Sequence, residues 1–212
     1  MESTLSHQYI VAFKSKLDIF DQFMNSGANA NEINELEDFI EAKLPESHID
    51  LLRIYNGEKS SIGFMGGFSY LGIEEIKMQW IFLKEAPEME AEGINQVEKI
   101  KNTLYCSKRI PFAYDGSGNY LAIDFNPNSE GTLGQILYLP TGDPEPIAVI
   151  ADSFDDFLAL IIEKLESEQL ELIDEREEWD EEDWHMAEIY FERTWENDWS
   201  DIAAEYNTKN GN

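Results

Sequence analysis

The chain has 212 residues, of which 42% are hydrophobic, enough to bury one sizeable core and too many for a chain that stays unfolded. Against 15 Lys and Arg stand 44 Asp and Glu, so the formal charge is -29 at pH 7. This field repels phosphate backbones and anionic lipid headgroups, so we expect no direct nucleic-acid or membrane partner. A basic protein is the natural complement, and acidity that serves solubility alone is the alternative.

The first residues and the single cysteine bear on where the protein works. Cys106 is the sole cysteine, so it cannot form an internal disulfide, which fits a reducing compartment. The first 25 residues lack a basic start followed by an apolar stretch. No segment approaches the roughly 18 apolar residues of a membrane span. We therefore expect a cytoplasmic protein.

The first half of the chain is mainly helical in its pattern. Apolar residues at helical spacing predict four helices, over residues 5–24, 33–40, 47–54 and 73–83. Asn29 and Glu32 have the spacing of a capping box ahead of the second helix, and Ser47 is placed to cap the third. Glycines among aromatic residues at 63–72 indicate short strands and tight turns.

The second half predicts antiparallel strands and a closing helix. Turn-forming residues at 115–119 separate two apolar runs, which is typical of a hairpin. Further strands are expected over 135–139 and 147–150, and Ser153 opens a helix that runs to about residue 165. The predicted fold class is α+β, with a mostly antiparallel sheet packed against N-terminal and closing helices.

Composition changes near residue 166, which predicts a domain over 1–166 and an acidic, Trp-rich extension over 167–212. The last fifty residues hold 18 acidic and 4 basic residues, and four of the five Trp. Trp184, Ala187, Phe191 and Trp195 follow helical spacing, so we expect a long helix with one aromatic stripe. Aromatic anchors among acids suit a partner-binding surface, and its candidate residues are Trp179, Glu182, Asp183, Trp184, Glu188, Trp195 and Trp199. The alternative is packing on the domain or on a second copy in a homodimer.

No pattern predicts catalytic, cofactor-binding or metal-binding residues, so we expect no enzyme. Asp115, Ser117 and Asn119 alternate like calcium ligands, but Tyr120 stands where such a loop needs Gly, which favours a simple hairpin turn. The three histidines are scattered, and carboxylate pairs are uninformative in so acidic a chain. Asp115 and Asp124 are candidate partner contacts, with structural hydrogen bonding as the alternative. An enzyme or a calcium-dependent module remains a third hypothesis for the chain.

Three blocks of sequence follow one another over about residues 28–166. The first runs from Asn29-Ala-Asn-Glu-Ile33 to Tyr55-Asn-Gly57, the second from Ile110 to Pro127, and the third is Ser153-Phe154 with Phe157-Leu158. Together they resemble the SUKH superfamily, the Smi-one/Knr-four group. The matched residues are read mainly as determinants of turns and packing. They are Ile33, Leu36, Glu37, Leu44, Pro45, Tyr55, Asn56, Gly57, Pro111, Phe112, Gly116, Gly118, Asn119, Gly134, Gln135, Phe154, Phe157 and Leu158.

The resemblance implies an α+β fold and, as in stand-alone bacterial members, an immunity protein that binds and neutralises a cognate toxin. Many such toxins act on nucleic acids and need basic surfaces, which an acidic inhibitor can occupy. The alternative is an intracellular scaffold or adaptor like the fungal regulators of cell-wall synthesis. The acidic tail is not part of the family pattern, so the resemblance assigns it no role.

Overall fold

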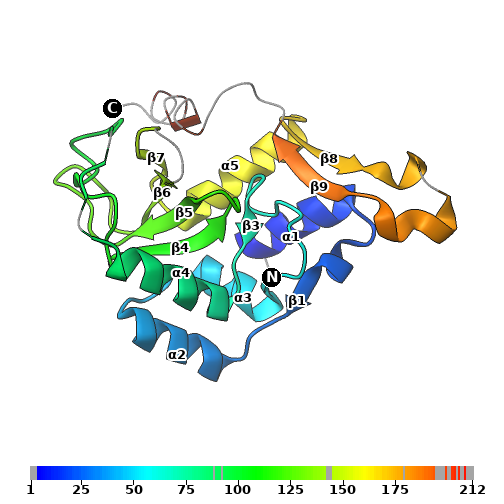
Figure 1. The fold of residues 1–212 in the computed structure, drawn as a ribbon, viewed down its shortest axis with the longest axis horizontal. Coiled ribbons are helices and arrows are strands. Elements are labelled where there is room, and N and C mark those ends of the chain that lie inside the picture. Colours follow the sequence, from blue (N-terminus) through cyan, green and yellow to red (C-terminus); the bar gives the residue numbers. More distant parts are fainter. Residues whose placement is uncertain are drawn as a thin grey trace.

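The computed structural model describes residues 4–87, 89–91, 93–141, 145–178 and 180–193, and residues 199, 202, 203, 205 and 208. The described chain is an α+β fold, which confirms the predicted class (Figure 1). The α-helices are α1 (Leu5–Lys16), α2 (Ala30–Ile40), α3 (Glu46–Ile54), α4 (Ile73–Glu85) and α5 (Phe154–Glu166). The strands are β1 (Met24–Ser26), β2 (Tyr55–Glu58), β3 (Ser69–Tyr70), β4 (Arg109–Tyr114), β5 (Asn119–Asp124), β6 (Gln135–Pro140), β7 (Ala148–Ala151), β8 (Leu170–Asp174) and β9 (Ile189–Arg193). Short 3-10 helices are η1 (Phe20–Phe23), η2 (Glu175–Glu178) and η3 (Glu181–Met186).

The central sheet has the order β3-β4-β5-β6-β7, and every neighbouring pair is antiparallel. The predicted hairpin is β4–β5, in which Tyr114 pairs with Tyr120 across the turn. Two smaller sheets, β1-β2 and β8-β9, lie outside this central sheet.

Both faces of the central sheet are buried, so its strands read as nearly continuous apolar runs. Leu121, Ile123 and Ile136 belong to the main core, which also holds buried residues of α1, α3 and α5. The residues adjacent to these in the strands, such as Tyr120 and Leu137, have side chains on the opposite face of the sheet and belong to a second cluster. That cluster is closed by Leu83 at the end of α4 and by residues of the segment 86–107, which leads into β4.

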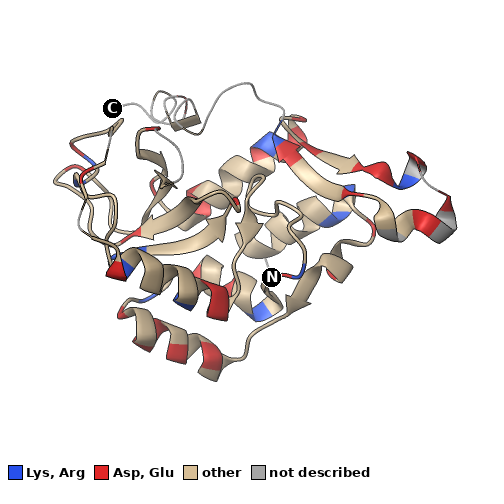
Figure 2. Cartoon of the chain, viewed as in Figure 1, with Lys and Arg blue, Asp and Glu red and all other residues tan. Residues whose placement is uncertain are grey.

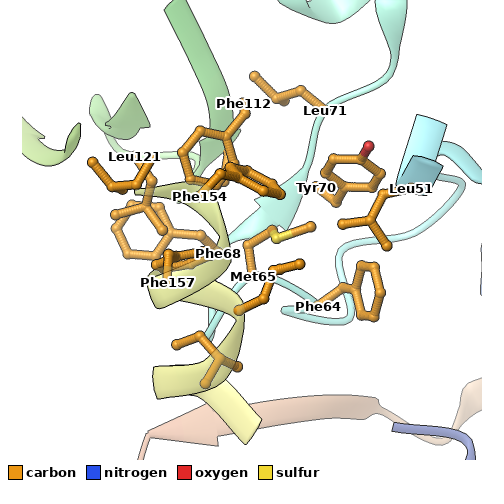
Figure 3. Packing of buried hydrophobic residues seen from close by; sticks show 14 of the residues in the cluster. Leu51, Phe64, Met65, Phe68, Tyr70, Leu71, Phe112, Leu121, Phe154 and Phe157 are labelled. Carbon is orange, nitrogen blue, oxygen red and sulfur yellow. The ribbon is translucent and has the colours of Figure 1, made fainter. Parts of the chain in front are cut away.

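Aromatic side chains from distant parts of the chain meet in the main core (Figure 3). The Phe112 ring on β4 lies 5.1 Å from Phe154 and 5.4 Å from Phe157, both on α5. Edge-to-face pairs of this kind stabilise a core beyond the area that they bury. The matched family residues Phe112, Phe154 and Phe157 therefore hold the closing helix on the sheet.

The N-terminal helices confirm the predicted types and correct two boundaries. The first helix ends at Lys16 rather than near residue 24, because Leu17 adopts an extended conformation (φ -129°, ψ 108°) and η1 and β1 follow. The predicted capping box is present, since the Asn29 side chain accepts from the Glu32 N–H and Glu32 accepts from the Asn29 N–H at 2.7 Å. The predicted cap at Ser47 is wrong, because α3 already begins at Glu46 with Pro45 before it.

The long helix predicted through Trp184, Ala187 and Phe191 is wrong for the described residues up to 193. This segment is a hairpin, β8–β9, whose strands pair from Leu170 with Arg193 to Asp174 with Ile189. Leu170 and Phe191, one from each strand, are buried in the main core, and this packing favours paired strands over a helix. Trp184 and Phe191 consequently do not share one helical stripe.

The hairpin and the last described residues pack on the same core as the rest of the chain. Phe191 lies edge to face with Phe13 of α1, with 4.6 Å between ring centroids. Trp199 has helical backbone and is 1% exposed, and its ring contacts Phe68 and Tyr138. The division of the chain at residue 166 stays a prediction. Within the described residues, no helix is long and apolar enough to cross a membrane.

Candidate protein-interaction surface

The β8–β9 hairpin has an inner face that packs on the core and an acidic outer face. Leu170 and Phe191 point inward and are buried. The outer face carries Glu171, Ile173, Tyr190 and Glu192, and we call these four residues the outer hairpin face. Alternation along each strand places all four on the same side of the ribbon.

Two acids stand directly opposite each other on the outer hairpin face. Glu171 is the cross-strand partner of Glu192, and both are exposed. Like charges in this position destabilise a hairpin. Burial, followed by Glu192, Glu188 and Glu175, raises the pKa of Tyr190. The hairpin thus keeps an arrangement that costs stability and concentrates negative potential at one place.

Arg176 fixes the end of the hairpin against the N-terminal part of the chain. Its Nε donates to Asp174 Oδ1 at 2.9 Å, and its Nη2 donates to Asp18 Oδ1 at 3.1 Å. The hydrogen bond from Arg176 lowers the pKa of Asp174, and the same bond raises that of Arg176. The guanidinium is therefore neutralised by two carboxylates and ties η2 to the α1–η1 turn.

A pocket of about 450 Å³ opens beside this ion pair. Its lining residues come from η1 and the preceding Ile19 on one side, and from the β8–β9 connection and the first residue of β9 on the other. They are Ile19, Gln22, Phe23, Arg176, Trp184, Ala187 and Ile189. Trp184 is 44% exposed, and its ring lies 5.7 Å from the Arg176 guanidinium carbon. We call this the Trp184 pocket, and it can take an apolar side chain of a partner.

Acidic residues dominate the surroundings of the hairpin and of the Trp184 pocket. Figure 2 shows acidic positions along β8, β9 and their connection, with few basic ones. Asp18 and Asp21 on the facing segment have side chains that are 77% and 65% exposed, and they pair with Arg176 and Lys14 respectively. An apolar pocket with an acidic rim suits a partner whose apolar anchor is surrounded by Lys or Arg.

The structure brings some of the predicted interaction residues to this surface and places others elsewhere. Trp184 lines the pocket, Asp183 is half-buried, and Glu188 is exposed, with its N–H donating to Glu175 Oε2 at 3.1 Å. Trp199 is buried against the domain instead. Trp179 and Trp195 and the side chain of Glu182 lie outside the described residues.

Asp115 is engaged within its own hairpin turn. One carboxylate oxygen accepts from the N–H groups of Ser117, Gly118 and Asn119, and the other accepts from the side chains of Ser117 and Asn119. Burial acts to raise the pKa of Asp115, but the hydrogen bonds from Ser117 and Asn119 outweigh it and lower that pKa. The carboxylate therefore organises the β4–β5 turn, as the structural alternative predicted.

Asp124 is fully buried and belongs to a polar cluster at the other end of the same hairpin. It accepts from Gln135 Nε2 and from the Asn126 N–H, each at 3.0 Å, and its Oδ1 lies 3.9 Å from Arg109 Nε. Arg109 also donates to the carbonyl of Lys101. This cluster holds the segment 86–107 on the sheet, so a direct contact of Asp124 with a partner would require the hairpin to open.

The matched family residues that are polar or Gly serve turns and helix ends. Glu37 accepts from the Leu44 N–H at 2.9 Å and so closes the turn between α2 and α3. Asn56 Oδ1 accepts from the Ile73 N–H at 2.8 Å at the start of α4. Gly57 has φ +80°, and an added Cβ would lie 2.3 Å from the Gly72 nitrogen. Glu37, Asn56 and Gly57 therefore shape turns and helix ends in this fold.

Among the described residues, no group of three or more His, Cys, Asp or Glu side chains is placed to hold an ion. His48 is buried among aromatic rings, and Cys106 is a half-buried free thiol.

Several residues that shape this surface are not among those predicted from the sequence. Glu171, Tyr190 and Glu192 belong to a segment in which Trp184, Ala187 and Phe191 follow helical spacing, and neither strand alternates apolar and polar residues along its whole length. The sequence does not indicate the role of Arg176, because a single basic residue among acidic ones belongs to no recognisable motif.

The sheet order, the closing helix and the turn residues together define an α+β domain of the SUKH type, with an acidic hairpin after the closing helix. Residues 27–160 match the SMI1 / KNR4 family (SUKH-1), and the chain belongs to this family. This confirms the resemblance that the three sequence blocks indicated.

Two curated relatives are fungal proteins. The chain is 28% identical over 159 residues to a Schizosaccharomyces pombe protein described as a cell wall biosynthesis/cell cycle regulator, which covers 66% of this chain and 31% of the relative. It is 26% identical over 190 residues to a Neurospora crassa protein described as a glucan synthesis regulatory protein, which covers 71% of this chain and 35% of the relative. The chain thus spans about a third of the length of these relatives.

Proposed function

We propose that this chain works by binding the basic surface of another protein, and that it does so as an immunity protein that neutralises a cognate toxin. The observation that carries the proposal is the exposed pair Glu171 and Glu192, which stand directly opposite each other on the outer face of a hairpin whose other end lines the Trp184 pocket. A cation from a partner relieves this repulsion, while the pocket takes an apolar anchor. A toxin that holds nucleic acid presents the required positive surface.

The test is co-expression with a candidate toxin encoded beside the gene for this chain. We expect growth to be rescued and a stable complex to elute in gel filtration. The double variant Glu171→Lys/Glu192→Lys should weaken the complex and slow association, because it reverses the steering field at the site.

A matched control exists on another surface of the same chain. Glu98 and Glu130 are both exposed, and the Glu130 N–H donates to the Glu98 carbonyl at 3.0 Å, so they are neighbours. Glu98→Lys/Glu130→Lys changes the net charge equally and should leave the complex intact. Absence of rescue and of a complex with the wild-type chain, or equal losses in both variants, would refute the proposal.

A second candidate function is regulation of cell-wall synthesis through protein partners, and the descriptions of the two fungal relatives favour it. In the Schizosaccharomyces pombe relative, the segment that matches this chain can be replaced by residues of this chain. Restored cell-wall integrity in that chimera would support regulation, and failure of a stably expressed chimera would count against it.

A further inference from the structure

Helix α4 is apolar on two opposite sides, although it lies at the surface. Ile76, Trp80 and Leu83 are buried against the rest of the molecule. On the outward side, Met78 is 59% exposed and Phe82 is 53% exposed. A surface helix normally carries polar residues on its outward side, and a helix that is apolar all round is normally buried.

The outward side of α4 forms one continuous strip. Glu74, Met78, Ile81, Phe82 and Glu85 recur at helical spacing, so they share a face, and all five are exposed. Three large apolar side chains thus lie in the middle, with one acid at each end of the helix. We call these five residues the α4 strip.

The two basic residues of the helix offset these acids only in part, because both also lie over neighbouring rings. Lys77 Nζ is 5.8 Å from the centre of the Phe39 ring on α2, and Lys84 Nζ is 4.5 Å from the Trp80 ring. Lys77 also pairs with Glu74 at 2.7 Å, and the Glu74 side chain is still 84% exposed. Figure 2 shows acidic positions at both ends of α4.

We propose that the α4 strip is a second docking surface, which takes an apolar segment flanked by Lys or Arg from a protein partner. The length of the strip and its apolar centre fit the apolar face of an amphipathic helix laid along α4. The two terminal acids select for bases on either side of that face. This proposal concerns a site inside the family-matched region and does not depend on the identity of the hairpin's partner.

The charges argue against a second copy of this chain as the occupant. In a two-fold symmetric pair the same strip faces itself, so each acidic end meets an acidic end of the other copy, whichever way the helices run. Two chains of net charge -29 also repel each other at long range. A partner with basic flanks gains from the same arrangement.

The test uses a labelled synthetic helical peptide with Leu along one face and Lys on its other positions, and a counterpart with Glu in place of every Lys. Fluorescence anisotropy with the full chain should show binding of the Lys peptide and none of the Glu peptide. Ile81→Ser/Phe82→Ser should weaken that binding about tenfold or more, since two anchors are lost. Glu74→Gln/Glu85→Gln should weaken it less and flatten its salt dependence.

The matched control is Val11→Ser/Leu133→Ser, which removes two apolar side chains that are 51% and 69% exposed elsewhere. It should bind the Lys peptide as the wild type does, and circular dichroism should show all variants folded.

Three results would overturn the proposal: no binding of the Lys peptide, equal losses of affinity in the strip variant and the control, or loss of affinity in Glu171→Lys/Glu192→Lys with none in the strip variant. A wild-type dimer that the strip variant converts to a monomer would overturn it as well. These outcomes do not depend on the result of co-expression with a candidate toxin.

Discussion

Replacing the buried His48 with Phe should stabilise the protein, and more so in acid than at neutral pH. His48 on α3 is fully buried, and its ring stacks on Phe154 with 4.8 Å between centroids. Tyr70 and Phe112 lie within 6.0 Å on its other sides. Neither imidazole nitrogen has a hydrogen-bond partner among the described residues. A Phe ring keeps the aromatic packing and removes two unpaired polar atoms.

The size of the effect follows from proton binding. Burial lowers the pKa of His48 from its ordinary value of 6.5 to about 3, so the folded protein holds the ring neutral while the unfolded chain protonates it. Because the folded pKa is depressed, the stability contribution is present above pH 6.5 and is lost as pH falls toward 3. Between pH 7.5 and pH 5 the wild type should lose about 2 kcal/mol through this residue, and His48→Phe should not.

The measurement is urea unfolding of both proteins at pH 7.5 and pH 5.0. The difference in free energy of unfolding between His48→Phe and wild type should grow by about 2 kcal/mol at the lower pH. His7→Phe changes an exposed histidine and should show no such growth. A difference for His48→Phe that is the same at both pH values would refute the reasoning, because it would mean that His48 is not held neutral by burial.

Three further predictions concern the turn, the buried carboxylate and the hairpin. Gly57→Ala should cost more than about 1 kcal/mol in thermal unfolding, because φ is +80° and the new Cβ would lie 2.3 Å from a backbone nitrogen; a cost below that would contradict the close approach. Glu58 accepts from three backbone N–H groups, so Glu58→Gln should cost about 1–3 kcal/mol at pH 5. Burial raises the pKa of Glu58 from 4.5 to about 7, so the wild type loses stability as pH rises through this range and the Gln variant should lose less, which urea unfolding at pH 5 and 7.5 can check. Glu192→Lys should stabilise the hairpin by about 0.2–1 kcal/mol and weaken partner binding, and a stabilised variant that binds as well as wild type would argue against the hairpin as the site.

The sequence predicts the family-matched part of the fold well, because its signals are local and consistent with one another. The capping box at Asn29, the turn at Asp115 and the cap at Ser153 each fix an element through neighbours in the chain. The segment 86–107 could not be predicted in this way. It is held by Arg109 and by Gln135, which donates to the Lys99 carbonyl at 3.1 Å, and such contacts have no sequence period.

Only part of the candidate site could be predicted. A sequence rich in acidic residues does not show which of them lie next to each other in the fold. Trp184 was identified from its surroundings, and the structure places it at the pocket. Glu171 and Glu192 are twenty-one residues apart, and nothing in the sequence shows that they face each other. The spacing of Trp184 and Phe191 fits a helix. The packing of Phe191 on Phe13 favours the strand that the structure shows.

The positions of the two proposed surfaces relative to the family match suggest how their roles divide. The α4 strip lies within residues 27–160, whereas the outer hairpin face and Trp184 lie beyond residue 160. A fold shared by proteins of different function gains specificity from what is added to it. We therefore expect the hairpin to determine which partner this chain accepts, and the α4 strip to accept basic amphipathic segments more generally. Exchange of residues 167–193 between this chain and a family member with a known partner should then transfer partner choice while the Lys peptide still binds at α4. Transfer of partner choice with the α4 strip instead would reverse this assignment.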